Sequence, residues 1–338
     1  MNNPSWQFNL GRPPNVKRAL KFEKRRSHPS SPFRRPPPLR RLEAISSFIN
    51  VDLCVVSPLQ RAKQGQSATL IRGLCMGRLG IIGATGWLGQ ALGLNLLRQR
   101  VWPAEDLVLL NRSGPSVAYA EFPGVIWAHD AHELLEQCET VVLSVRPEDF
   151  PVPGFAPRDN LLISFMTAWT IDRLQNLAPA ARIVRAMPNG GASTGQSYTP
   201  WLVGPGITAS DLALTARLLS AMGQEDRIET ETQLNYLSAL SGSGAAYPAL
   251  MARAMLTDAA EQGLPEPVAL RAVEAVICGS TGLLAGKLAE VPALLDAYMS
   301  YRGITAAGLA AAEAAGFEQA IRSALSAAMA KAEAMAAT

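Results

Sequence analysis

Three glycines, placed between a short apolar run and a helical pattern, are the residues of this sequence best suited to hold a ligand. Gly83, Gly86 and Gly89 follow residues 79–82, whose length and lack of charge are typical of a buried parallel strand. Leucine and alanine then recur at helical spacing as far as Leu97. A strand, a glycine turn and a helix form the phosphate-binding entry of a dinucleotide fold, because glycine lets the backbone approach a pyrophosphate.

The glycine spacing is G-x-x-G-x-x-G, one residue longer in the turn than the usual fingerprint. An ordinary strand-to-helix turn is therefore the alternative interpretation. We assign the turn and the start of its helix to cofactor binding, namely Gly83, Thr85, Gly86, Trp87, Leu88 and Gly89.

A polar turn follows the next apolar run, DLVLL at 106–110. About 20 residues beyond the glycine turn, NAD-binding proteins carry an acidic residue that holds the ribose 2′-hydroxyl. This sequence has Asn111, Arg112 and Ser113 instead. A cation and a hydroxyl suit a 2′-phosphate, so the sequence favours NADP(H) over NAD(H). A polar turn without a ligand is the alternative.

Short apolar runs alternate with helical patterns up to about residue 205. The runs predict strands at 106–110, 125–129, 140–145, 160–164 and 182–186. The helix expected over 170–177 has Thr170 at its N-cap. This alternation predicts an α/β fold of Rossmann type with a doubly wound parallel sheet. Ligands bind at the carboxyl ends of such strands, so Val145, Arg146 and Pro147 are further candidates for the cofactor site.

Helical patterns follow one another beyond residue 205. They cover 210–222, 233–261, 267–287, 292–299, 305–315 and 317–335. The long run from Gln233 is small and apolar on several faces, so we expect it to be buried against a second subunit. The expected domains are an NADP-binding domain at 76–205 and an all-α dimerisation and substrate domain at 206–338.

Residues 1–75 differ from the rest of the chain. They hold 14 Lys and Arg against 3 Asp and Glu, whereas the remainder holds 17 against 25. This leader is rich in Arg, Pro and Ser, and we expect it to be disordered. A start codon assigned too early, with Met76 as the true start, is the first interpretation. A targeting peptide and a tail for nucleic acid or a membrane surface are the others.

Several classes of function are disfavoured. The acidic remainder of the chain gives no reason to expect a nucleic-acid partner, and no apolar run reaches the roughly 18 residues of a membrane span. The cysteines and histidines show no metal-ligand spacing, so we expect no metal. The segment SGSG at 241–244 is no hydrolase motif, because no histidine lies beyond His132. A cytoplasmic location is expected.

Several segments resemble pyrroline-5-carboxylate reductases, in the order in which that family carries them. IVRAMPNGGA at 183–192 is similar to their R-A-M-P-N-T-P-A, and LSGSGAAY at 240–247 to their S-G-S-G-P-A-[YF]. MSYRGIT at 299–305 falls where they carry S-P-G-G-T-T, and LLISFMTAWT at 161–170 resembles their L-V-V-S-I-A-A-G-V-T. The resemblance covers the whole chain except the leader.

The resemblance implies reduction of a cyclic imine, 1-pyrroline-5-carboxylate, to proline by a homodimer or a ring of dimers. It places Pro188 and Asn189 on the nicotinamide side of the cofactor. Ser300 and Gly303 match the loop that holds the substrate carboxylate. Thr305 stands at the threonine proposed to hydrogen-bond the imine nitrogen, and is the candidate catalytic residue.

Two departures from the family pattern concern the substrate. Gly190 follows Asn189 where the family has threonine, and Tyr301, Arg302 and Ile304 replace Pro, Gly and Thr. Arg302 either clamps a carboxylate bidentately, as a substrate-binding residue, or blocks the site. The departures leave two alternatives open, a reductase of a different cyclic imine or imino acid and an NADP-binding dimer without catalysis.

Overall fold

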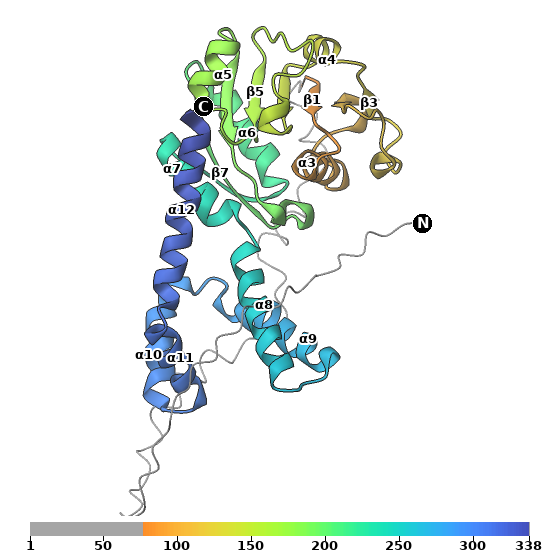
Figure 1. The fold of residues 1–338 in the computed structure, drawn as a ribbon. Helices are drawn as coiled ribbons and strands as arrows, with labels where there is room; N and C mark the ends of the chain where they lie inside the picture. Colours follow the sequence, from red (N-terminus) through yellow and green to blue (C-terminus); the bar gives the residue numbers. More distant parts are fainter. Residues whose placement is uncertain (1–76, 338) are drawn as a thin grey trace, which may run out of the picture.

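The computed structural model describes residues 77–337 and shows a half built on a β-sheet and a helical half (Figure 1). The sheet has the strand order β3-β2-β1-β4-β5-β6-β7-β8. The strands are β1 (Leu79–Ile82), β2 (Leu107–Leu110), β3 (Ile126–Trp127), β4 (Thr140–Leu143), β5 (Leu161–Ser164), β6 (Arg182–Ala186), β7 (Ser197–Val203) and β8 (Gly223–Arg227). Strands β1 to β6 are parallel, and the order runs outward in both directions from β1. The predicted doubly wound sheet is confirmed.

Helices cover both faces of the sheet, which explains why its central strands carry almost no charge. On one face α3 (Trp87–Arg98) and α6 (Ala209–Ser220) pack over Ile81. On the other face α4 (Ala131–Gln137) and α5 (Ile171–Leu177) pack over the next residue, Ile82. Successive strand residues thus enter two separate cores, as the two-residue period of a strand requires.

Helices α5 and α6 of the sheet half begin at threonine capping residues. The Thr170 hydroxyl accepts a hydrogen bond from the Arg173 backbone at the start of α5, as the sequence predicts. Thr208 and Asp211 form a capping box at the start of α6. Asp211 also accepts a hydrogen bond from Arg182 Nε at 2.9 Å, and so joins α6 to the first residue of β6.

The sheet continues past the domain boundary expected at residue 205. Strand β7 is antiparallel to β6, and β8 pairs with β7 in parallel, with α6 between them in the chain. The sequence did not reveal these strands, because β7 contains Pro200 and β8 is the polar segment GQEDR. The sheet half therefore ends near Arg227.

The helical half contains six α-helices within the described residues. They are α7 (Glu231–Leu237), α8 (Ala246–Glu261), α9 (Glu266–Glu274), α10 (Val291–Tyr301), α11 (Ile304–Ala314) and α12 (Phe317–Ala337). The shorter turns between them are η7 (Ser238–Gly242), η8 (Ala275–Gly279), η9 (Ser280–Leu284) and η10 (Leu288–Glu290). The helix expected as one piece over 233–261 is divided, because Gly244 adopts a positive φ of 53° between η7 and α8.

Helix α12 returns the chain from the far end of the helical half to the sheet half (Figure 1). It packs against α7 and η7, the first elements of the helical half. The helical half is consequently closed by contact between its first and last helices.

One helical segment, Glu266–Leu284, is long and apolar enough to cross a membrane by length and composition. The expectation that no stretch reaches this length is therefore corrected. Only 11% of its apolar window is buried within the single chain. Large apolar side chains are exposed on other helices of this half too, such as Leu250 on α8 and Leu288 in η10. A surface shared with a second copy explains both observations.

Candidate functional site

The glycine turn between β1 and α3 packs directly against the end of β4. Gly83 has a positive φ of 88°, and a Cβ there would lie 2.3 Å from the carbonyl oxygen of Ser144. A Cβ on Gly89 would lie 2.4 Å from the Gly83 carbonyl oxygen. Only glycine fits at these two positions, so the backbone approaches as closely as a phosphate-binding turn requires.

The amino end of α3 is open to an anion. Gly86 is its N-cap, no side chain caps it, and no acidic residue lies in its first turn. The positive end of the helix dipole and the first N–H groups are consequently available to a phosphate.

A cavity of about 530 Å³ lies at the carboxyl ends of β1, β2 and β4. Eight residues predicted to bind the cofactor line it, namely Gly83, Thr85, Gly86, Asn111, Arg112, Ser113, Val145 and Arg146. His129, Asp130 and Asp149 also line it and were not predicted. His129 ends the run 125–129, so the strand-end rule that selected Arg146 would have found it too.

Arg112 extends from the β2 turn with 87% of its side chain exposed. Its Nη1 lies 3.7 Å from Asp149 Oδ1, and this carboxylate is itself 40% exposed. Exposed ion pairs contribute little free energy, so the guanidinium is free to turn toward a phosphate.

Six predicted cofactor residues do not line this cavity. These are Trp87, Leu88, Gly89, Pro147, Pro188 and Asn189. Trp87 reaches the 188–191 loop, because a Cβ on Gly190 would lie 2.8 Å from its indole. The indole and the bare Gly190 are therefore complementary, and threonine would not fit there without displacing the ring.

The 188–191 loop is tied to the helical half through Asn189. The Asn189 carboxamide accepts a hydrogen bond from Gly191 N–H at 2.9 Å. Its Nδ2 donates to the Ser241 carbonyl at 3.0 Å, within η7. The loop at the end of β6 is therefore fixed to the point where the helical half begins.

The predicted substrate residues lie at the exposed junction of α10 and α11. Ser300 lies at the end of α10, Arg302 and Gly303 join the two helices, and Thr305 lies at the start of α11. None of them lines the cavity at β1, β2 and β4. Ile304 beside them is 93% exposed. Arg302 keeps the left-handed conformation, with a φ of 55°, at the position where glycine was expected. Within one chain these residues form no enclosed site with the cofactor turn.

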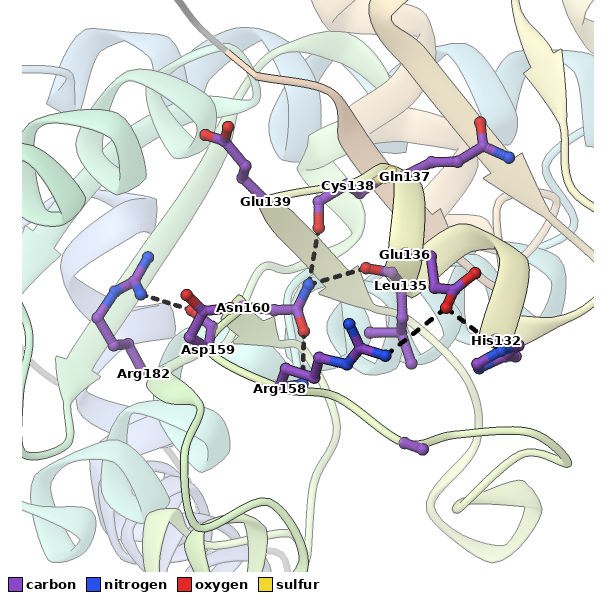
Figure 2. A pocket seen from close by; sticks show the side chains of 11 residues that line it. His132, Leu135, Glu136, Gln137, Cys138, Glu139, Arg158, Asp159, Asn160 and Arg182 are labelled. Atoms are coloured by element: carbon purple, nitrogen blue, oxygen red, sulfur yellow. Dashed lines mark hydrogen bonds and ion pairs between the residues drawn. The ribbon is translucent and has the colours of Figure 1, made fainter.

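A second cavity, of about 620 Å³, lies at the opposite ends of the strands (Figure 2). Glu136 there is paired with both His132, at 3.5 Å, and Arg158, at 3.7 Å. The buried Asn160 donates to the carbonyls of Leu135 and Cys138. These polar groups are paired with other groups of the protein. In addition, open parallel sheets bind ligands at the carboxyl ends of their strands, and this cavity lies at the amino ends.

Cys138 has no sign of reactivity. Burial raises the pKa of its thiol to about 12, although the charge of Arg78 opposes the shift. The thiol is therefore protonated at neutral pH and inert as a nucleophile. Within residues 77–337 no group of three or more His, Cys, Asp or Glu could hold a metal ion.

Comparison with known proteins identifies relatives over both halves. The family model described as pyrroline-5-carboxylate reductase dimerisation matches residues 231–335. A pyrroline-5-carboxylate reductase from Synechocystis sp. is 28% identical over 256 residues, covering 74% of this chain and 95% of the relative. Another, from Haemophilus influenzae, is 29% identical over 258 residues, covering 74% and 94%.

A solved 1-pyrroline-5-carboxylate reductase from Streptococcus pyogenes is similar in structure, with a TM-score of 0.67 and 25% identity. It covers 77% of this chain and 99% of its own. The sheet, the glycine turn with its cavity and the helical half define a dinucleotide-binding domain joined to a helical dimerisation domain. The chain is similar to pyrroline-5-carboxylate reductases over both halves, and residues 231–335 match the dimerisation model of that family.

Proposed function

We propose that this protein reduces 1-pyrroline-5-carboxylate to proline with NADPH, as a homodimer. The observation that carries the proposal is the cavity that joins the glycine turn to the turn of Asn111, Arg112 and Ser113. The named relatives carry the same activity in their names. The substrate is an imine, and the reaction adds a hydride to its carbon and a proton to its nitrogen.

The residues present fit the proposed cofactor. NADPH supplies the hydride when it is bound. The bare backbone of Gly83 and the open end of α3 hold the pyrophosphate, while Arg112 and Ser113 hold the 2′-phosphate. Pro188 and Asn189 lie on the nicotinamide side. A structure of the Plasmodium falciparum relative with NADP bound has the same fold, with a TM-score of 0.66 and 24% identity.

The substrate half of the site requires a second copy of the chain. In one chain Ser300 and Thr305 lie at the exposed junction of α10 and α11, away from the cofactor cavity. In a dimer the first N–H groups of α11, together with Arg302, hold the substrate carboxylate. Thr305 hydrogen-bonds the imine nitrogen. The protein otherwise orients its substrate and excludes water, because hydride transfer needs little acid–base apparatus.

A different cyclic imine is the second candidate substrate. Tyr301 and Ile304 are large, apolar and 68% and 93% exposed, so in a dimer they would enlarge the apolar lining beside the carboxylate loop. This observation favours an imine with a larger apolar ring over the small pyrroline.

We also propose that the protein acts in the cytoplasm, without a nucleic-acid or membrane partner. The acidic composition beyond residue 75 supports the absence of a nucleic-acid partner. The exposed apolar helices of the matched dimerisation segment are accounted for by a partner subunit, which supports the absence of a membrane partner.

Purified protein mixed with NADPH and pyrroline-5-carboxylate tests the proposal by the loss of NADPH absorbance. Oxidation of NADPH with stoichiometric formation of proline is the expected result. Turnover confined to larger cyclic imines would support the second candidate. Tight NADPH binding with no turnover over a broad panel of imines would show a dimer that binds the cofactor without catalysis.

A further inference from the structure

An ion pair between a buried arginine and a partly exposed glutamate joins the sheet half to the helical half. Arg185 lies in β6 with 3% of its side chain exposed, and its guanidinium pairs with Glu231, the first residue of α7. The second carboxylate oxygen of Glu231 accepts a hydrogen bond from the Ile171 N–H at 2.8 Å. Nη2 of Arg185 donates to the Met166 carbonyl at 3.2 Å. The pair thus contacts four elements at once.

These contacts reach the loops on the nicotinamide side of the proposed site. Met166 belongs to the loop 165–170, which leaves the carboxyl end of β5. Arg185 itself lies two residues before the loop 187–191. The first of these loops continues to the cavity rim, because Trp169 Nε1 donates to the Pro147 carbonyl at 3.1 Å. The loops after β4 and β5 are therefore linked, and the ion pair attaches the loop 165–170 and the end of β6 to α7.

Stability alone does not explain the pair. Arg185 is buried, whereas Glu231 is 32% exposed. Burying a charge costs free energy that the attraction of its partner seldom repays, so an apolar pair of similar volume is often as stable. Burial lowers the pKa of Arg185, and the charge of Glu231 opposes that shift. Nε of Arg185 is also buried without a hydrogen-bond partner among residues 77–337. The pair instead fixes the orientation of α7 relative to the loops 165–170 and 187–191.

We propose that Arg185 and Glu231 are positioning residues, which hold the loops 165–170 and 187–191 in register with the helical half so that cofactor and substrate meet. This inference rests on the proposed reductase function. Neither residue contacts the reactants. Their contribution is to the geometry between a nicotinamide held by the sheet half and an imine held by helices.

The double variant Arg185→Met/Glu231→Leu separates positioning from stability, because it removes both charges and leaves neither buried alone. We expect it to unfold within a few degrees of the wild type. Its kcat should fall about tenfold or more, while the Kd for NADPH, set largely by the glycine turn and Arg112, stays within about threefold. Hydrogen exchange in the loops 165–170 and 187–191 should become faster.

Arg182→Met is the matched control. Arg182 lies on the same strand and pairs with Asp211, but at the amino end and on the opposite face. This variant should lose stability, keep kcat within about twofold, and leave exchange in the two loops unchanged.

Two results would overturn the proposal. One is a double variant with wild-type kcat and wild-type exchange in both loops, and the other is an equal loss of kcat in Arg182→Met. If the wild type reduced no imine, the proposed function would fail instead, and the exchange of the two loops would decide the positioning role by itself.

Discussion

At the scale of single residues, Arg112 is the residue that we propose determines the choice of cofactor. It stands at the end of β2, in the place where an acidic side chain would accept hydrogen bonds from the ribose of NAD. Its neighbour Asp149 holds it only by an exposed ion pair. Breaking this ion pair therefore costs little free energy when the Arg112 side chain turns toward a phosphate.

Replacing Arg112 with alanine should weaken NADPH binding far more than NADH binding. A charge-assisted hydrogen bond to a phosphate contributes about 1.5–3 kcal/mol, so the Kd for NADPH should rise about 10- to 100-fold. The Kd for NADH should change less than about threefold. Fluorescence titration with both nucleotides measures this. Arg98→Ala, which removes another exposed arginine, is the control, and equal losses for the two nucleotides would refute the assignment.

The residues of this site that could be predicted from the sequence are those marked by the backbone, either by a glycine turn or by the end of a strand. Gly83 and Gly89 were found because no side chain fits in their turn, and Arg112 because it follows a strand at a set distance. Asp149 and Glu231 were missed, because nothing in their local sequence indicates that they approach Arg112 and Arg185. Such contacts depend on how distant segments pack.

At the scale of elements, the start of α6 shows how one carboxylate can serve a helix and a sheet. Burial alone would raise the pKa of Asp211, but hydrogen bonds from Thr208 and Arg182 outweigh burial and lower it. Asp211 is thus ionised in the folded protein at a pH where the unfolded chain has begun to bind a proton. The contribution of ionised Asp211 to the free energy of unfolding is complete above the unfolded pKa of about 3.9. It is lost as the pH falls through the pKa of Asp211 in the folded protein, which is lower.

Asp211→Asn should therefore be destabilising at neutral pH and much less so in acid. We expect a loss of about 1–2 kcal/mol in the free energy of unfolding at pH 7. Below the unfolded pKa of about 3.9 the difference from the wild type should become smaller as the pH falls. Urea unfolding at neutral and at acidic pH measures it. Glu105→Gln, at an exposed carboxylate, should show little effect at either pH, and a pH-independent loss in Asp211→Asn would contradict the pKa shift.

Elements with strong periodicity were predicted well, and those without it were not. Buried strands such as β4 and β5 are charge-free runs, so their existence followed from composition. Strand β8 lies at the edge of the sheet and is polar, so no apolar signal marked it. The break between η7 and α8 was missed because small and apolar residues continue on both sides of Gly244.

At the scale of the whole molecule, the exposed apolar helices require a partner. Leu250 on α8 is 54% exposed and Leu270 on α9 is 48% exposed, both in the segment that matches the dimerisation model. The cavity at β1, β2 and β4, by contrast, is built from one chain. Loss of the dimer should consequently separate cofactor binding from turnover.

The variant Leu250→Glu/Leu270→Glu should be monomeric by light scattering. Two buried charges at the interface oppose association, because each would lose its hydration without a partner. Imine reduction should fall about 100-fold or more, with the Kd for NADPH within about threefold. Leu177→Glu, a change at a 40% exposed leucine of the sheet half, should remain dimeric and active. A monomer with full activity would refute the two-chain site.

The contact of α12 with α7 and η7 has a consequence for biosynthesis. The sheet half consists of units that pack on their chain neighbours, so it can fold while translation proceeds. Helix α7 packs on β7, which precedes it in the chain, but its other partner α12 begins some eighty residues after α7 ends, and contacts of such separation form slowly. The faces of α7 and η7 that α12 covers are therefore exposed until α12 has been synthesised.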